Sequence, residues 1–208
     1  MDCNVVYLMR HSERNKEYLF DSPLSKEGIE NSKTVIVRKL EDYSFDRIYC
    51  SPYLRTIQTI APYCRKYKVK IKLDWALVEN LPEEEVSFSE FDDIIDNKYK
   101  PVISFGEKCN ALCSGMVKSS NKHMEIQLLL EALRVRASKF LSSLKSGKVL
   151  VVTHLPVMNA FLRAKGHSTS LYEYHSPGSM LLLKEYEFSE SSDITPSDSP
   201  AISQEISL

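Results

Sequence analysis

Glycine is scarce in this chain, which has six glycines among its 208 residues. A loop that cradles phosphate through backbone amides needs several glycines at fixed spacing, and the sequence contains no such P-loop motif. No hydrophobic run approaches the roughly 20 residues of a membrane span. The N-terminus also lacks the basic start and long apolar stretch of a secretory signal. These absences argue against a P-loop enzyme and a membrane protein, and they favour a soluble globular domain.

Cysteine occurs five times, an odd number with no spacing typical of a disulfide framework. We therefore expect reduced thiols in a cytoplasmic or nuclear protein. A cysteine-based phosphatase needs the motif C-x5-R, but Cys50 precedes Arg55 by one residue too few. Cys109, Cys113 and His123 make an incomplete ligand set for zinc, so we predict no metal site.

An excess of charge of either sign is also missing, since the net charge at pH 7 is −1. A strongly basic chain would attract nucleic acid or an anionic membrane surface as a whole, and this chain does not have that property. We therefore expect neither nucleic acid nor a membrane as a partner. A local basic pocket remains compatible with this total.

Hydrophobic periodicity predicts strands that alternate with helices. The predicted strands are Asn4–Met9, Asp46–Cys50, Val69–Leu73, Lys148–Thr153 and Met180–Tyr186. The predicted helices begin near Ser25, at Ser51, at Glu125 and at Pro156. In the first helix, Val35, Ile36 and Leu40 are expected to face the core. This alternation predicts an α/β fold, a three-layer sandwich with a mostly parallel sheet and helices on both faces.

Capping residues suggest where the helices begin and end. Ser51 is a favoured N-cap and Pro52 a favoured first helical residue, so the second helix is predicted to begin there. Pro62 should kink this helix or end it. Gly147 is predicted to cap the helix that begins at Glu125.

The chain is predicted to hold one domain over residues 1–187. Within it, residues 82–123 lack clear periodicity and are interpreted as a variable, irregular insertion with one short helix at most. Residues 188–208 are rich in Ser, Asp, Glu and Pro and have too few large apolar side chains to pack, which predicts a disordered tail.

Polar clusters follow three of the predicted strands directly. Arg10 and His11 follow the first strand, the segment that contains Arg55 follows the second, and His154 follows the fourth. Ligands of open α/β sheets bind at the carboxyl ends of strands, so these clusters are expected to share one site, together with Arg14. Several arginines held together favour an anion, and their planar guanidinium groups suit phosphate oxygens. The sequence therefore predicts a phosphate site.

Five ordered motifs resemble those of the histidine phosphatase superfamily, also called the phosphoglycerate-mutase-like family. They are Arg10-His11-Ser12-Glu13-Arg14, the segment Asp21–Gly28, the segment Ser51–Thr59, the segment Trp75–Glu79, and Val152-Thr153-His154. The first is close to the Arg-His-Gly-Glu-Arg form of the phosphatase branch, and the third is similar to S-P-x-x-R-[TA]-x-Q-T. The resemblance covers the chain from Val5 to about Leu183 and implies a phosphoglycerate-mutase-like fold.

The resemblance implies a phosphoric monoester hydrolase of the histidine acid phosphatase type, with a two-step mechanism and no metal or cofactor. His11 would attack phosphorus and become a phosphohistidine. Glu79 would protonate the leaving oxygen and then activate water for the second step. The residues implied to hold the phosphate oxygens are Arg10, Arg14, Arg55 and His154.

Two site residues depart from the family pattern. Ser12 stands where the family has glycine, and Leu155 stands where a glycine often follows the second histidine. Glycine allows positive φ and a close backbone approach to a ligand, and a leucine that pointed into the pocket would restrict it. Two alternatives therefore stay open: a phosphomutase of the same family, and a weakly active or inactive phosphate-binding interaction module.

The expected partner is a phosphorylated substrate, either a small molecule or a phosphoprotein. The insertion at 82–123 comes shortly after Glu79 in the chain. We therefore hypothesise that it forms a lid over the pocket and sets substrate specificity. The sequence indicates neither the substrate itself nor the oligomeric state.

Overall fold

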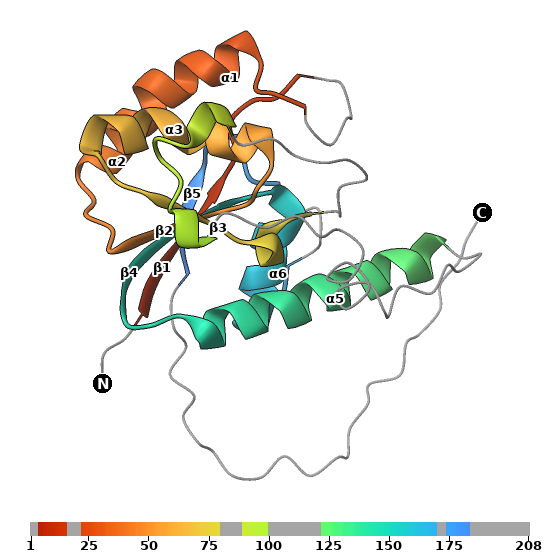
Figure 1. Cartoon of the computed structure of the whole chain (residues 1–208). Coiled ribbons are helices and arrows are strands. Elements are labelled where there is room, and N and C mark those ends of the chain that lie inside the picture. Colours follow the sequence, from red (N-terminus) through yellow and green to blue (C-terminus); the bar gives the residue numbers. More distant parts are fainter. Residues whose placement is uncertain (1–3, 16–21, 80–88, 100–121, 170–173, 184–208) are drawn as a thin grey trace, which may run out of the picture.

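The computed structural model describes residues 4–15, 22–79, 89–99, 122–169 and 174–183. In this part of the chain, one sheet has the strand order β3-β2-β4-β1-β5 (Figure 1). The strands are β1 (Asn4–Arg10), β2 (Arg47–Cys50), β3 (Ile71–Leu73), β4 (Gly147–Thr153) and β5 (Met180–Leu183). Pairing is parallel among β1 to β4 and antiparallel between β1 and β5. The predicted, mostly parallel sheet is therefore confirmed.

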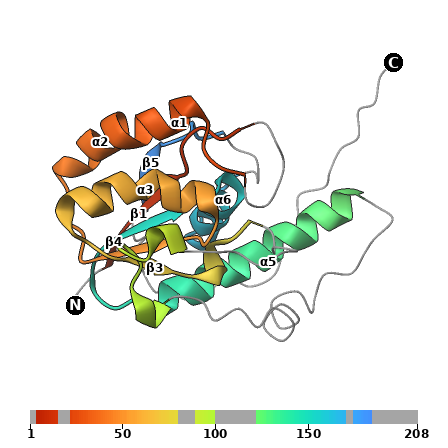
Figure 2. The ribbon, with the colours of Figure 1, turned by 45° about the horizontal axis from the view of Figure 1, so that its top comes forward.

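Helices cover both faces of this sheet (Figures 1 and 2). The helices on one face are α1 (Lys26–Asn31), a π-helical turn (Ser32–Ile36), α2 (Val37–Glu41) and α3 (Leu54–Tyr67). The helices on the other face are α5 (Lys122–Ser143) and α6 (Leu155–Ala164). Short 3₁₀ turns are formed by Trp75–Leu77, Ser89–Phe91 and Asn97–Tyr99. The predicted three-layer sandwich is thus confirmed.

The central strand β4 shows why both faces must be covered. Its side chains alternate, so Val149 and Val151 pack in the cluster that contains α5 and α6, whereas Leu150 and Val152 pack in the α3 cluster. All four side chains are fully buried. Burial of one such aliphatic side chain contributes about 1.5–3 kcal/mol. A strand that is apolar on both faces therefore recruits a helical layer to each side.

The first helical segment differs from its predicted pattern. Ile36 and Leu40 are buried as predicted, but Val35 is 54% exposed, so its predicted inward orientation was wrong. Residues Ser32–Ile36 form a π-helical turn, which holds more residues than an α-helical turn and rotates the side chains that follow it. Val37 consequently takes the buried position expected for Val35.

The second helix begins later than predicted. The predicted start at Ser51 was wrong, because α3 begins at Leu54. The Ser51 hydroxyl lies 2.9 Å from the His154 Nε2 atom and does not cap the helix. Pro62 lies inside α3, which continues to Tyr67, so this proline does not end the helix. The contact with His154 thus overrides the local capping preference.

Helix α5 begins at Lys122, three residues before the predicted start, and ends at Ser143. Gly147 does not cap it, because this residue is the first of β4, with φ at +130°. A β-carbon at this position would lie 2.7 Å from the Asp46 Oδ2 atom. Glycine is therefore needed for the close approach of β4 to the residue that precedes β2.

Part of the predicted insertion packs into the core. Phe91, Ile94 and Ile95 are buried in the α3 cluster, and Ile95 bridges to Ile71 of β3. The remainder of the insertion (82–88 and 100–121) and the predicted tail (188–208) lie outside the described residues. The predicted lid and the predicted domain boundary at 187 therefore stay predictions. In the described part of the chain, no helix combines the length and hydrophobicity needed to cross a bilayer.

Two cysteines lie within the described residues, and both are free and buried. Burial raises the pKa of the Cys50 thiol well above its usual range and raises that of Cys64 to about 12. A buried, protonated thiol is a poor nucleophile. Cys50 lies directly before the polar segment that follows β2, and its buried state agrees with the absence of a C-x5-R motif.

Candidate active site

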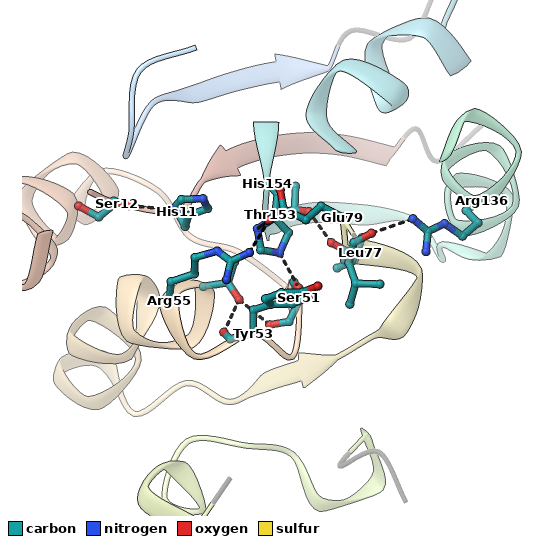
Figure 3. A network of polar contacts seen from close by, with 12 residues as sticks. His11, Ser12, Ser51, Tyr53, Arg55, Leu77, Glu79, Arg136, Thr153 and His154 are labelled. Carbon is teal, nitrogen blue, oxygen red and sulfur yellow. Dashed lines mark hydrogen bonds and ion pairs between the residues drawn. The ribbon is translucent and has the colours of Figure 1, made fainter. Parts of the chain in front are cut away.

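Three strand ends meet at the carboxyl edge of the sheet (Figure 3). The His11 amide, just after β1, donates to the Thr153 carbonyl at 2.9 Å, and the Ser51 amide, just after β2, donates to the Val152 carbonyl at 3.0 Å. These bonds extend the ladders on both sides of β4, whose next residue is His154. The structure therefore brings together the polar segments that follow β1, β2 and β4.

His11 is held in an orientation that suits a nucleophile. Its side chain is 4% exposed, and its Nδ1 atom lies 2.7 Å from the Ser12 carbonyl oxygen. A carbonyl oxygen can only accept a hydrogen bond, so Nδ1 carries the proton and Nε2 keeps its lone pair. Burial is the largest cause that lowers the pKa of His11 to about 3, and the positive charge of Arg55 adds to it. The ring is therefore neutral at physiological pH.

His154 lies beside His11, with 5.4 Å between the ring centroids. It is fully buried, its Nε2 pairs with the Ser51 hydroxyl, and its Nδ1 makes no hydrogen bond within the described residues. Burial, followed by the charge of Arg55, lowers the pKa of His154 well below its usual value. A fully buried ring nitrogen without a hydrogen bond is unusual in a folded protein.

Arg55 pairs with Glu79, the predicted acid, and its charge acts on both histidines. It lies in the first turn of α3, and its side chain is 1% exposed. The Arg55 Nη2 atom donates to Glu79 Oε1 at 2.5 Å, and its guanidinium carbon lies 4.2 Å above the Tyr53 ring. The same Glu79 oxygen lies 3.9 Å from His154 Nδ1, and the Glu79 side chain is 23% exposed. One carboxylate oxygen therefore faces both a cation and a histidine.

Arg10 and Arg14 supply further positive charge at this edge. The Arg10 Nη1 atom donates to the His175 carbonyl at 2.5 Å, and Arg10 is half-buried. Burial lowers the pKa of Arg10, and the nearby Tyr174 opposes this effect. Arg14 is also half-buried, and its charge lowers the pKa of His11. The structure thus brings the three predicted arginines to the site.

Ser12 and Leu155, which replace family glycines, adopt ordinary backbone conformations. Lys68 is the single non-glycine residue with positive φ in the described ranges, so neither position uses the freedom of glycine. The Ser12 amide donates to the Thr59 hydroxyl at 2.9 Å, and Leu155 is the half-buried first residue of α6. Both residues fit their positions without backbone strain.

Gly28, the last residue of the second motif, permits a close packing contact. A β-carbon at this position would lie 1.9 Å from the Glu13 carbonyl oxygen. The same oxygen accepts a hydrogen bond from the Ser25 amide at 3.0 Å. The beginning of α1 therefore rests against the segment that carries Arg14, and any larger residue would push them apart.

Several contacts at the site were missed by sequence reasoning. Tyr53 supports both the Arg55 guanidinium and the His154 ring, with 4.7 Å between the centroids of the two rings. The Thr153 hydroxyl donates to the Leu77 carbonyl at 2.7 Å, near the predicted acid. Tyr53 and Thr153 lie inside the third and fifth motifs, so the motifs contained a signal for them, although not for their partners.

The buried histidines predict a stability that falls in acid. The pKa of His11 is about 3 in the folded chain and near 6.5 when exposed, so between these values the unfolded chain binds more protons. Stability is then complete above about pH 6.5 and decreases by up to about 1.4 kcal/mol per pH unit below it for this histidine. His154 acts in the same direction. Urea unfolding from about pH 7 to about pH 5 measures the slope.

His11→Asn is the matched variant for this pH dependence, because it removes one titrating ring and keeps a polar side chain. Its unfolding free energy should depend less steeply on pH than that of the wild type. An identical slope in both proteins would contradict the neutral, buried state of His11.

Comparison with known proteins provides independent evidence on the family. A model of the histidine phosphatase superfamily, branch 1, matches residues 6–111, just over half of the chain. No curated protein matches the chain at a significant level.

Solved structures with the same fold cover most of the chain. The ecdysone phosphate phosphatase of Bombix mori has a TM-score of 0.52 at 15% identity and covers 94% of this chain and 98% of its own. The phosphoglycerate mutase of Bacillus anthracis has a TM-score of 0.55 at 18% sequence identity, and the match covers 88% of this chain and 90% of the mutase. The phosphoserine phosphatase of Entamoeba histolytica has a TM-score of 0.53 at 14% identity, and the match covers 86% of this chain and 89% of the phosphatase. At these identities the likeness shows the fold, which is phosphoglycerate-mutase-like, as the sequence predicted.

Proposed function

Because this chain belongs to the histidine phosphatase superfamily, branch 1, we propose that it is a metal-independent phosphatase that hydrolyses a phosphomonoester through a phosphohistidine on His11. The observation that carries this proposal is the state of the His11 ring. Its Nδ1 atom is tied to the Ser12 carbonyl at 2.7 Å, and its pKa is about 3. The Nε2 lone pair is therefore available over the whole physiological pH range.

In the first step, the His11 Nε2 lone pair forms a bond to phosphorus while the bond from phosphorus to the leaving oxygen breaks. Glu79 enters this step in its protonated form and donates that proton to the leaving oxygen, so the product leaves as an alcohol and Glu79 is left as the carboxylate that pairs with Arg55. In the second step, the Glu79 carboxylate takes a proton from water, which attacks the phosphohistidine. Inorganic phosphate leaves, and His11 regains its neutral ring.

The transferred group carries negative charge in both steps, and the surrounding side chains match it. Arg10, Arg14 and Arg55 supply guanidinium donors, which are shaped for phosphate oxygens. The unpartnered Nδ1 of His154 supplies a neutral donor in the tautomer that protonates it. In this proposal the groups stabilise the transition state electrostatically, and burial keeps Arg55 and His154 fixed and largely free of water.

A phosphorylated compound is the substrate class that these features favour. The two phosphatases named above act, by their names, on ecdysone phosphate and on phosphoserine. A phosphoglycerate mutase shares the fold, so transfer to a second substrate and simple phosphate binding are the other outcomes to be distinguished. The variable segment after Glu79 remains our candidate for the lid that selects among substrates.

Hydrolysis of p-nitrophenyl phosphate in the presence of EDTA tests the proposed function. We expect phosphate release that persists with EDTA from about pH 5 to about pH 8, because the nucleophile stays unprotonated there. Phosphate and p-nitrophenol should appear in equal amounts. No release from the folded protein would contradict hydrolysis and favour a mutase or a binding module.

Restoring glycine at the two departures from the family pattern should not increase activity. Ser12→Gly and Leu155→Gly are each expected to change turnover by less than about threefold, because neither residue needs positive φ in the structure. Leu155→Gly should also lower stability by about 1 kcal/mol, because it removes a half-buried aliphatic side chain. Steady-state kinetics and thermal unfolding measure both effects. A gain of tenfold or more in either variant would show that the native side chain restrains catalysis.

A further inference from the structure

Arg136, on helix α5, contacts the segment Leu77–Glu79, here called the acid loop because it carries the predicted acid (Figure 3). It lies on α5, and its Nη2 atom donates to the Val78 carbonyl at 2.7 Å. Val78 directly precedes Glu79 and is fully buried. Sequence reasoning gave Arg136 no role, because nothing in the surrounding segment of the long helix resembles a motif.

The hydrogen bond acts on the backbone plane that carries the acid. The carbonyl of Val78 shares its peptide plane with the amide nitrogen and the Cα atom of Glu79. A guanidinium that holds this oxygen therefore restricts rotation of the plane and so fixes the position from which the Glu79 side chain extends. A hydrogen bond from a charged donor is stronger than a neutral one, which suits this task.

A second hydrogen bond ties Leu77, the residue before Val78, to the sheet. The Thr153 hydroxyl donates to the Leu77 carbonyl at 2.7 Å, and Thr153 is fully buried beside His154. Thr153 thus links the Leu77 carbonyl to β4, and Arg136 links the Val78 carbonyl to α5. Of the two, Arg136 is the one that can be changed without disturbing the strand that carries a site histidine.

We propose that Arg136 is a positioning residue for Glu79, which sets the carboxyl group where it protonates the leaving oxygen. The inference rests on the proposed function, since it concerns the acid of that reaction. A small displacement of a reacting group is costly in an active site, because catalysis requires the reacting atoms in a narrow geometry. Arg136 acts through Glu79 and has no contact with the phosphoryl group in this mechanism.

The leaving group separates this role from a structural one. A p-nitrophenolate ion leaves without a proton, whereas an alkoxide leaves only if an acid protonates it. The value of kcat/KM covers the steps up to and including phosphorylation of His11, where the acid is used. We therefore measure kcat/KM for p-nitrophenyl phosphate and for the alkyl ester β-glycerophosphate.

Arg136→Met should lower kcat/KM for the alkyl ester by about 10- to 100-fold and for the nitrophenyl ester by less than about threefold. Arg136→Lys, which keeps a charged donor, should recover part of the loss. Arg134→Met is the matched control, because Arg134 lies on the same helix and its ion pair with Glu131 is exposed. It should match the wild type with both substrates.

Glu79→Gln, measured with the same two esters, separates the proposed acid role of Glu79 from the positioning role of Arg136. If Glu79→Gln shows the selective loss and Arg136→Met does not, the role of Arg136 is wrong and the proposed acid stands. An equal loss with both esters in Arg136→Met would likewise overturn the role, since it indicates a general structural effect. If Glu79→Gln shows no selective loss, the proposed acid is wrong and the inference about Arg136 fails with it.

Discussion

Replacing His11 with alanine is expected to lower kcat by about 10⁴-fold or more. The reason is that the neutral His11 ring keeps its Nε2 lone pair, since its Nδ1 proton is held by the Ser12 carbonyl. His154 is neutral too, but its ring is fully buried, with Nε2 on the Ser51 hydroxyl at 2.9 Å and Nδ1 facing Glu79 at 3.9 Å. The loss should appear with every phosphate ester, because the nucleophile takes part whatever the leaving group is.

Chemical rescue provides the control for this substitution. Imidazole added to His11→Ala can occupy the space that the ring leaves and present a nitrogen to the phosphate. We expect added imidazole to restore part of the p-nitrophenyl phosphate turnover in this variant and to leave the wild type unchanged. Turnover in His11→Ala near the wild-type rate, without imidazole, would contradict the nucleophilic role of His11.

Replacing Arg55 with methionine is expected to lower kcat/KM by about 10³-fold. The side chain is almost fully buried, lies over Tyr53 and donates to Glu79 at 2.5 Å. Its loss would remove a positive charge from the phosphate site and also the partner that orients the acid. Arg55→Lys keeps the charge but not the planar fork, so an intermediate activity is expected.

Arg65→Met is the matched control for Arg55, because Arg65 lies on the same helix and its ion pair with Asp93 is exposed. Exposed ion pairs contribute about 0–1 kcal/mol, so this variant should keep both its stability and its activity. Steady-state kinetics measure kcat/KM of Arg55→Met, Arg55→Lys and Arg65→Met, and urea unfolding curves measure their stability. A loss of less than tenfold in folded Arg55→Met would contradict a direct role for the guanidinium in the transition state.

The sheet was predictable from sequence because its strands are short apolar runs that are buried on both sides. Val149–Val152, for example, has no polar residue that would allow another assignment. The strand ends were predictable for a related reason, since Arg10, His11 and His154 are polar residues placed directly after such runs. A parallel sheet gathers them at one edge whatever the intervening chain does.

The local details were less predictable, because contacts from distant segments override short-range preferences. Ser51 looks like an N-cap, but a partner 103 residues away uses its hydroxyl. Val35 has an inward position in an ideal α-helix, but a π-helical turn gives that position to Val37. Arg136 reaches Val78 over 58 residues of sequence, and neither residue carries a local sign of the contact.

The family pattern pointed to residues that the structure brings together, but not to the contacts that hold them in place. The motifs pointed to Arg55 and Glu79 separately, and the structure adds that they form an ion pair that faces His154. The two substitutions of family glycines looked like candidates for impaired activity. Their ordinary backbone conformations show that neither Ser12 nor Leu155 strains the backbone at its position.

Transfer of the phosphoryl group to His11 is tested most directly by trapping the intermediate. The protein is mixed with p-nitrophenyl phosphate, quenched in alkali because phosphohistidine is labile in acid, and mapped by peptide mass spectrometry. We predict one added phosphoryl group on the peptide that contains His11 and none on the same peptide of His11→Ala. A phosphoryl group on any other residue, or continued turnover with no phosphorylated His11 in the quenched sample, would contradict the proposed mechanism.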